Sequence, residues 1–306
     1  MSIIKFILLW IVISLVLLVS WPVGIQSGNT ITHSNPPELA HAAAGAPDSS
    51  SIAVIFLSVC MVNSLLLSLM IWQTRSYKGA FRWMTLTLYV WVVQFVLTQM
   101  ETWFFVEGIA MSNAQILSIV IGGAVMSLAT VSAGIGVAAK MNNLKQRFIF
   151  RVNRWRPLWL PLLALTAVAY PLIYFTFGYF IAWQSEAVRV FYTHSGALDT
   201  FFAGTAKAIA DGVYLYQVLR AGIWVVVSLP LIVMLNKEHF FTQYILMGAL
   251  SALPSVLLFI PNPYMPADVA MAHFVETSTS NFLWGIAMVF CVNRAIRQGS
   301  ILVHSS

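Results

Sequence analysis

Long runs of apolar residues, separated by short polar connections, recur along the whole chain. A helix needs about 20 apolar residues to cross the roughly 30 Å hydrocarbon core of a bilayer, and eight runs reach or approach that length. They are residues 4–22, 52–72, 84–105, 116–139, 158–183, 214–235, 244–260 and 266–292. The runs are continuously apolar, whereas the strands of a membrane barrel alternate apolar and polar residues. The pattern therefore predicts an all-α, polytopic bundle of eight transmembrane helices.

The composition agrees with this pattern and excludes a water-soluble fold. Apolar residues make up 59% of the chain and charged residues only 8%, against about 25% charged in a typical soluble domain. Such a chain is not a soluble enzyme, a disordered tail or a disulfide-stapled secreted domain. Its two cysteines, Cys60 and Cys291, fall at different predicted depths and in no metal-binding spacing, so neither a disulfide nor a cysteine metal site is expected.

The positions of Lys and Arg predict the orientation, because these residues concentrate on the cytoplasmic side of membrane helices. With the N-terminus inside, Arg189 and Lys207 are the only basic residues in outer loops, Arg220 lies within a span, and all others fall in inner segments. We therefore expect both termini in the cytoplasm and the first span to remain as a signal anchor. The expected location is a plasma (inner) membrane, crossed several times.

The net charge of +6 is concentrated on the predicted inner side of the membrane. The basic excess lies in the inner loop 140–156, which faces the anionic lipids of the inner leaflet. The predicted partner of this loop is the lipid bilayer, and no nucleic-acid partner is expected.

A single membrane-embedded domain over residues 1–306 is expected, with longer extracytoplasmic loops at 27–50 and 184–213. The second loop mixes aromatic and charged residues, a combination typical of a short amphipathic helix on the outer surface. Its functional interpretation is a lid over an outward-facing cavity.

The fourth span carries small residues on several faces, including the i, i+4 pairs Gly123/Ser127 and Ser132/Gly136. Small side chains allow helix backbones to approach closely in lipid. The span is therefore predicted to pack against other helices of the bundle, and it is the candidate surface for a membrane-protein partner.

Four ionisable residues fall within the predicted spans, namely Glu101, Arg220, His273 and Glu276. Each is a functional hypothesis, because an ionisable group in the membrane costs at least a few kcal/mol to insert. At a rise of 1.5 Å per residue they lie roughly 6, 9, 10 and 15 Å below the outer boundary, in that order. All four are therefore predicted in the outer half of the membrane.

Each of these residues belongs to a polar stripe, since residues three or four apart share a face of a helix. The stripes are Gln94, Thr98 and Glu101 on the third span, Tyr214, Gln217 and Arg220 on the sixth, and His273, Glu276, Thr277 and Ser280 on the eighth. Three stripes at matching depth predict an outward-facing polar pocket among these spans.

Arg220 is the expected partner of Glu276, because its fixed charge and planar guanidinium suit a carboxylate. His273 then bonds either to Glu276 or to a ligand. Two alternatives stay open. In the first, the charged groups only form an internal salt bridge that locks the helices together, and no ligand binds. In the second, Glu101 does not line the pocket but extends to the water outside.

No HExxH motif, phosphate-binding glycine loop or evident Ser-His-Asp arrangement occurs in the sequence. His273, Glu276 and Glu101 reach the three ligands that a metal site needs. The nearby Arg220 would repel a divalent cation, so no metal site is predicted. The cofactor is left open, a quinone included.

Three functions fit these residues. The favoured one is binding or passage of a small solute, anionic or proton-coupled, with Arg220 as counter-charge and His273 and Glu276 as proton carriers. The first alternative is a membrane enzyme acting on a lipid-linked or lipophilic substrate at the outer face, with Glu276 or His273 as general base, or a quinol-binding subunit. The second is a non-catalytic subunit of a membrane complex.

Overall fold

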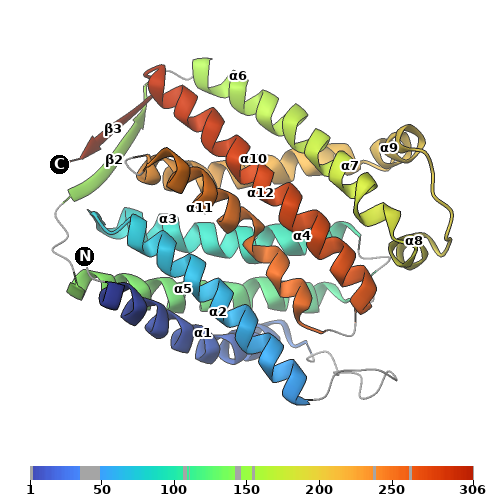
Figure 1. Ribbon diagram of the computed structural model, residues 1–306, viewed down its shortest axis with the longest axis horizontal. Coiled ribbons are helices and arrows are strands. Elements are labelled where there is room, and N and C mark those ends of the chain that lie inside the picture. The colour runs from blue at the N-terminus through green and yellow to red at the C-terminus, as the bar shows by residue number, and fades with distance from the viewer. Residues whose placement is uncertain are drawn as a thin grey trace. The chain divides into compact units, whose positions relative to one another are not determined.

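The chain is almost entirely helical in the computed structural model (Figure 1). The structure describes residues 3–34, 49–105, 109, 111–141, 146–153, 156–236, 239–261 and 264–305. Over these residues, seven helical segments are long and apolar enough to cross a membrane: Ile3–Thr32, Ser50–Gln73, Ala80–Phe104, Asn113–Met141, Leu158–Gln184, Val213–Leu235 and Phe240–Phe259. The prediction of an all-helical, membrane-embedded protein is confirmed.

The eighth predicted span forms one helix, α12 (Ala267–Arg297), whose 31 residues exceed the length of a membrane crossing. It is not among the seven apolar segments, because polar residues are concentrated in it from Glu276 to Asn281. The count of eight spans, and with it the cytoplasmic position of both termini, therefore stays a prediction. The first long outer loop, 27–50, lies outside the described residues from 35 to 48.

The chain divides into two compact units, which are described separately. The first consists of residues 1–149, 259–265 and 305–306, and the second of residues 150–258 and 266–304. The helices and strands of the first unit are α1 (Ile3–Thr32), α2 (Ser49–Gln73), β1 (Tyr77–Lys78), α3 (Ala80–Trp91), the π-helical segment η1 (Val92–Val96), α4 (Leu97–Phe104) and α5 (Asn113–Met141).

Close backbone contact between α1 and α5 builds the first unit. A Cβ atom on Gly24 would lie 2.7 Å from the carbonyl oxygen of Gly122. The two helices run antiparallel, since Lys5 Nζ donates to the carbonyl oxygen of Met141 at 3.0 Å, while Ser118 Oγ donates to Asn29 Oδ1 at 2.6 Å nearer the other end. Small residues of α5 therefore serve packing within the chain. A membrane-protein partner on this helix stays a prediction.

The structure buries Arg82, which the sequence does not predict. It falls in a polar connection by sequence, yet in the structure it lies on α3 and is only 1% exposed. Its Nη2 donates to the carbonyl oxygen of Ile71 at 2.7 Å and its Nε to Thr74 Oγ1 at 3.3 Å. The last carbonyl groups of a helix have no partner within that helix. Arg82 therefore caps the end of α2.

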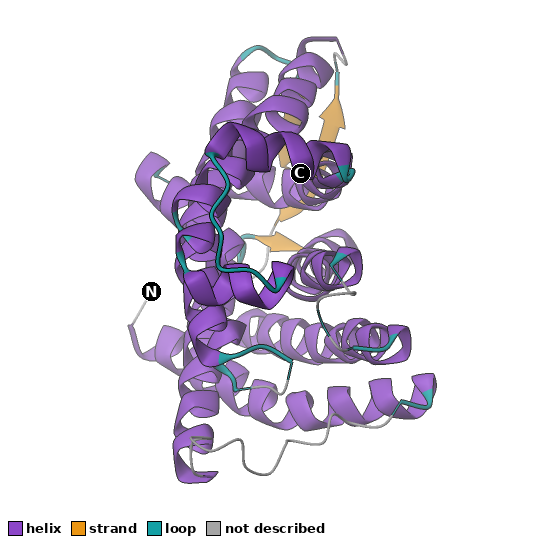
Figure 2. Ribbon diagram, turned by 90° about the vertical axis from the view of Figure 1, so that its right-hand side faces the viewer, coloured by secondary structure: helices purple, strands orange, loops and turns teal. Residues whose placement is uncertain are grey.

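The second unit contains most of the candidate site residues predicted from the sequence. A strand, β2 (Gln146–Val152), leads into it from the first unit, where β1 pairs in parallel with β2 and Tyr77 lies opposite Gln146. Figure 2 shows how small the strands are beside the helices. The remaining elements are α6 (Arg156–Ala164), the π-helical segment η3 (Leu165–Ala169), α7 (Tyr170–Phe180), η4 (Ala182–Gln184), α8 (Glu186–Thr193), α9 (Phe201–Ala210), α10 (Val213–Leu235), α11 (Phe240–Ala252), η5 (Leu253–Phe259), α12 and β3 (Ile301–Ser305).

A buried amide pair joins α10, α11 and α12 of this unit. Gln243 Nε2 donates to the carbonyl oxygen of Ile232 at 2.9 Å, and Gln243 Oε1 accepts from Asn293 Nδ2 at 2.8 Å. Both ends of the Gln243 amide are thus hydrogen-bonded. Nearby, a Cβ atom on Gly285 would lie 2.8 Å from the Cα of Gly248, so α11 and α12 pack with their backbones in contact.

The fifth predicted span is interrupted after its first seven residues by the π-helical segment η3, which separates α6 from α7. Single π-helical turns within α-helices are rare and are frequent at functional sites. Tyr214 on α10 donates from its hydroxyl to the carbonyl oxygen of Ala167, inside η3, at 2.8 Å. Tyr170, the first residue of α7, directly follows the interruption.

Candidate functional site

One face of α10 points its polar side chains at the interrupted helix. Tyr214, Gln217 and Arg220 follow each other at intervals of three residues, as the sequence predicts. Because its hydroxyl is hydrogen-bonded to Ala167, Tyr214 stabilises the junction between α6 and α7. Gln217 and Arg220 are both buried one and two turns further along.

Arg220 is held by two side chains that the structure brings together. Its Nη1 donates to the phenol oxygen of Tyr170 at 2.7 Å and to Gln217 Oε1 at 3.4 Å. A guanidinium only donates hydrogen bonds. The oxygen of Gln217 must therefore face Arg220, and the NH₂ group of the same amide must point elsewhere.

Two aromatic residues contact this cation, Tyr170 through its hydroxyl and Trp224 through its ring, and Trp284 packs against both of their rings. We call Tyr170, Trp224 and Trp284 the aromatic triad. The guanidinium carbon of Arg220 lies 5.6 Å from the ring centroid of Trp224. Within the triad the ring centroids of Tyr170 lie 6.2 Å from Trp224 and 4.7 Å from Trp284, and the two indoles are 6.4 Å apart. Since Trp284 belongs to α12, the triad joins α7, α10 and α12.

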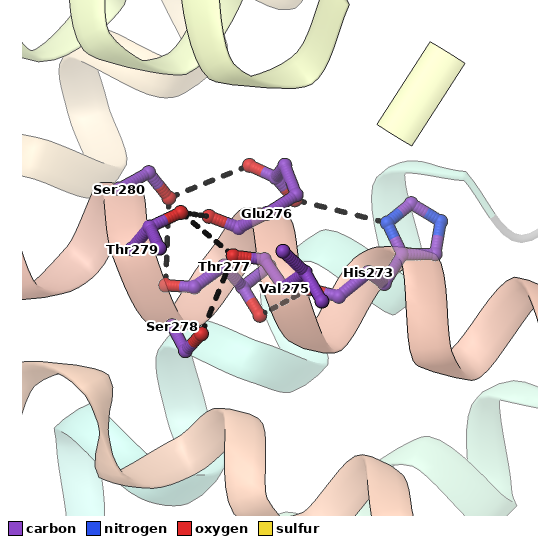
Figure 3. Close-up of polar contacts among 7 residues, drawn as sticks. All are labelled: His273, Val275, Glu276, Thr277, Ser278, Thr279 and Ser280. Atoms are coloured by element: carbon purple, nitrogen blue, oxygen red, sulfur yellow. Dashed lines mark hydrogen bonds and ion pairs between the residues drawn. The ribbon is translucent and has the colours of Figure 1, made fainter. Parts of the chain in front are cut away.

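The second predicted stripe of this unit lies on the same helix as Trp284. Figure 3 shows the carboxylate of Glu276 between Ser280 and His273, with Ser280 Oγ donating to Glu276 Oε1 at 3.4 Å. His273 Nδ1 lies 3.7 Å from Glu276 Oε2, an ion pair when the imidazole is protonated. Glu276, Ser280 and Trp284 follow at intervals of four residues and are all buried. The carboxylate of Glu276 and the Trp284 ring of the triad therefore share one face of α12.

The other hydroxyl groups of this stretch bond to their own helix. Thr277 Oγ1 donates to the carbonyl oxygen of His273 at 2.6 Å, and Ser278 and Thr279 donate to earlier carbonyl groups in the same way (Figure 3). Such bonds satisfy a hydroxyl without a partner helix. Thr277 is thus bound to its own backbone, and Ser280 is the hydroxyl of this stretch that donates to the carboxylate of Glu276.

His273 is covered by a helix that precedes it in the chain. The ring of Tyr192, on α8, packs edge-on against the imidazole with centroids 5.7 Å apart. Helix α8 lies in the loop 184–213 that the sequence singles out as long and aromatic, and it packs against α12. The ring of Tyr192 therefore covers one side of the His273 imidazole.

The third predicted stripe belongs to the first unit. Gln94 is buried within the π-helical segment η1, and Thr98 donates from its hydroxyl to the carbonyl oxygen of Gln94 at 2.9 Å. Glu101 lies on α4 and is half-buried. The pocket shared between these residues and those of the second unit stays a prediction.

Buried nitrogen atoms of the second unit mark the site most clearly. Among the described residues, the N–H groups of Gln217 Nε2, Trp224 Nε1 and Trp284 Nε1 have no acceptor, although their residues are 0%, 1% and 0% exposed. A buried donor without a partner costs about 1–3 kcal/mol, and buried indoles usually find one. His273 Nε2 is buried without a partner as well. Three of these nitrogens are N–H donors near the triad: Gln217 and Trp224 contact Arg220, and Trp284 packs on the Trp224 ring. We call these three donors the donor cluster.

Tyr170, Trp224 and Trp284 were missed by sequence reasoning, which treats aromatic residues in a span as core. A signal was present for two of them, since Trp224 lies four residues after Arg220 and Trp284 four after Ser280. Within the described part of the chain, no three His, Cys, Asp or Glu side chains lie together as a metal would require.

Comparison with known proteins finds no relative, since no family, no characterised protein and no solved structure matches this chain. The seven apolar helices define the class, a membrane-embedded helical protein. Any more specific function must be argued from the residues of the second unit.

Proposed function

We propose that the second unit binds a small solute within the membrane and passes it across, and that the solute carries acceptor oxygens. The observation that carries the proposal is the cluster of buried N–H groups without acceptors on Gln217, Trp224 and Trp284. Proteins rarely leave such groups unsatisfied. A ligand that accepts hydrogen bonds from these N–H groups removes the free-energy penalty of leaving them buried without an acceptor.

The chemistry of the cluster defines what it would recognise. An indole nitrogen only donates, as does the NH₂ end of an amide. Together with the cation of Arg220, these groups favour carboxylate or carbonyl oxygens on the ligand. The aromatic triad adds apolar contact, which suits the body of a small organic acid.

His273 and Glu276 supply the proton chemistry in this proposal. Their side chains lie 3.7 Å apart on α12, and an imidazole beside a carboxylate can accept and release a proton. A proton carried with the solute would neutralise its charge during passage. In this proposal the solute and the proton enter the site beside Tyr192, whose ring packs against the imidazole of His273.

A quinone presents the same carbonyl oxygens, so the experiment must separate a lipophilic ligand from an organic acid. The protein is purified in nanodiscs that retain native lipid, and molecules bound to it are identified by native mass spectrometry. We expect one small molecule bound to the wild-type protein, lost in Gln217→Met and retained in Ser278→Ala, whose hydroxyl is exposed and bonded to its own helix. Its mass distinguishes an acid from a quinone.

Identical bound molecules in the wild-type protein and in Gln217→Met would overturn the assignment of this site. If a ligand is found, its labelled form is then tested for uptake into proteoliposomes. Binding without uptake would leave a binding protein and remove the passage step.

A further inference from the structure

Helix α9 is a short, fully described helix with no buried residue. Its ten residues, Phe201–Ala210, span about 15 Å, too short to cross a bilayer. Thr200 caps its first turn by accepting from the backbone N–H of Ala203 at 3.4 Å. The helix is therefore well formed although it contributes nothing to the core of the second unit.

Both ends of α9 are tied to the ends of membrane-spanning helices. Phe201 packs against Tyr179 and Phe180, at the end of α7, with ring centroids 5.3 and 5.6 Å apart. The hydroxyl of Tyr179 donates to the carbonyl oxygen of Asp199 at 3.0 Å. At its other end α9 leads through two residues into α10. Figure 1 shows α8 and α9 at one end of this unit, next to the end of α7.

The exposed surface of α9 is divided by polarity. Phe202, Ala206 and Ile209 share one face because they follow at intervals of four and three residues, and we call them the apolar face of α9. Phe202 is 82% and Ile209 48% exposed. Lys207 points to the opposite side of the helix, since it is offset by about 140° from Phe202 at 100° per residue.

The apolar face continues the surface that the neighbouring spans present to lipid. On α10, Leu215 and Leu219 are more than half exposed, and so is Phe180 at the end of α7. These side chains belong to segments apolar enough to cross a membrane, so acyl chains are their expected surroundings. A helix fixed between the ends of these segments lies at the level of the lipid headgroups.

We propose that α9 is an interfacial helix whose apolar face inserts into the leaflet on the side of the α7–α10 connection. Phe202 and Ile209 then lie among the upper parts of the acyl chains, and Lys207 faces headgroups and water. Aromatic residues are typical of this depth, and an amphipathic helix lies in the plane of the interface when its apolar side faces the hydrocarbon. The charge distribution predicts that this leaflet is the outer one.

The test measures the depth of single side chains in the whole protein. Cys60 and Cys291, both buried, are replaced by Ala, and single cysteines are introduced at Phe202, Ile209 or Lys207 and spin-labelled. The protein is placed in nanodiscs of phosphatidylcholine and phosphatidylglycerol. Paramagnetic relaxation by oxygen, which concentrates in acyl chains, is compared with relaxation by a water-soluble nickel complex. Labels at Leu219 and Asp211 serve as lipid and water references.

We expect the labels at Phe202 and Ile209 to relax faster with oxygen, like the one at Leu219. The label at Lys207 should reverse this ratio and resemble the one at Asp211. Nickel-dominated relaxation at all three α9 positions would place the helix in water and overturn the proposal. Dipolar broadening at Phe202, with neither reagent reaching it, would show that a second copy of the chain covers the face, which also overturns it. Neither result depends on a bound solute.

Discussion

Gln217 accepts a hydrogen bond from Arg220 through Oε1 at 3.4 Å, and this contact turns its NH₂ group away from the cation. The NH₂ group is buried and has no acceptor among the described residues. Gln243 offers a comparison within the same unit, since it is also buried but has both ends of its amide bonded to Ile232 and Asn293. Both glutamines are buried, and they differ in whether the NH₂ group of the side chain has a hydrogen-bond acceptor.

This difference predicts that the same substitution is costly at one glutamine and nearly neutral at the other. Gln243→Met should lower the free energy of unfolding by about 2 kcal/mol, because it strands the groups that the amide now satisfies. Gln217→Met removes an unsatisfied donor together with a weak 3.4 Å acceptor for Arg220, whose Nη1 keeps its bond to Tyr170. The free energy of unfolding should therefore stay within about 1 kcal/mol of the wild-type value. Thermal and denaturant unfolding in detergent measure both. Equal losses would mean that Gln217 has a structural partner like that of Gln243.

The buried charges of α10 and α12 give a second prediction. If Arg220 and Glu276 stabilise one another, Glu276→Ala alone strands the cation and should lower the free energy of unfolding by about 3–5 kcal/mol. The double variant Arg220→Ala, Glu276→Ala should lose less than this single variant. Double-mutant cycles measured by unfolding provide the comparison. Additive effects of the two substitutions would contradict the pairing.

The orientation of α12 gives a third prediction. In a protein whose native cysteines are replaced, His273→Cys should react with a membrane-impermeant thiol reagent added from outside intact cells, because His273 is predicted near the outer boundary. Replacing Tyr192 by Ala as well should speed the reaction, since the Tyr192 ring covers this position. Labelling from the cytoplasmic side alone would reverse the assigned topology.

Packing of the first unit gives a fourth prediction, tested on two glycines of α5. Gly122→Ala should lower the free energy of unfolding by about 1–3 kcal/mol, because the new methyl group would press on the backbone of α1. At Gly136 no described atom lies within 4 Å of an added Cβ. Gly136→Ala should therefore be neutral, or stabilising by up to about 1 kcal/mol through its helix propensity. Similar losses for both would refute close contact of α1 with α5.

The sequence alone was enough to predict an all-helical membrane protein and seven of the helices that are long and apolar enough to cross a membrane. Hydropathy and length are local properties of a segment, and lipid leaves few alternatives to a helix. The stripes of Tyr214, Gln217 and Arg220, and of His273, Glu276 and Ser280, were likewise visible because a helix repeats every 3.6 residues. The less apolar α12 shows the limit of this reasoning, since its polar residues keep it out of the seven helices that are apolar enough to cross a membrane.

Only the tertiary structure decided what each polar group contacts. Periodicity places a residue on a face of its helix, but the rotation and spacing of neighbouring helices determine what that face meets. Tyr170 thus accepts from Arg220 although fifty residues separate them, and Arg82 is buried because the carbonyl groups ending α2 lie within its reach. The contrast between Gln217 and Gln243 depends on side chains from three helices, and no local pattern contains it.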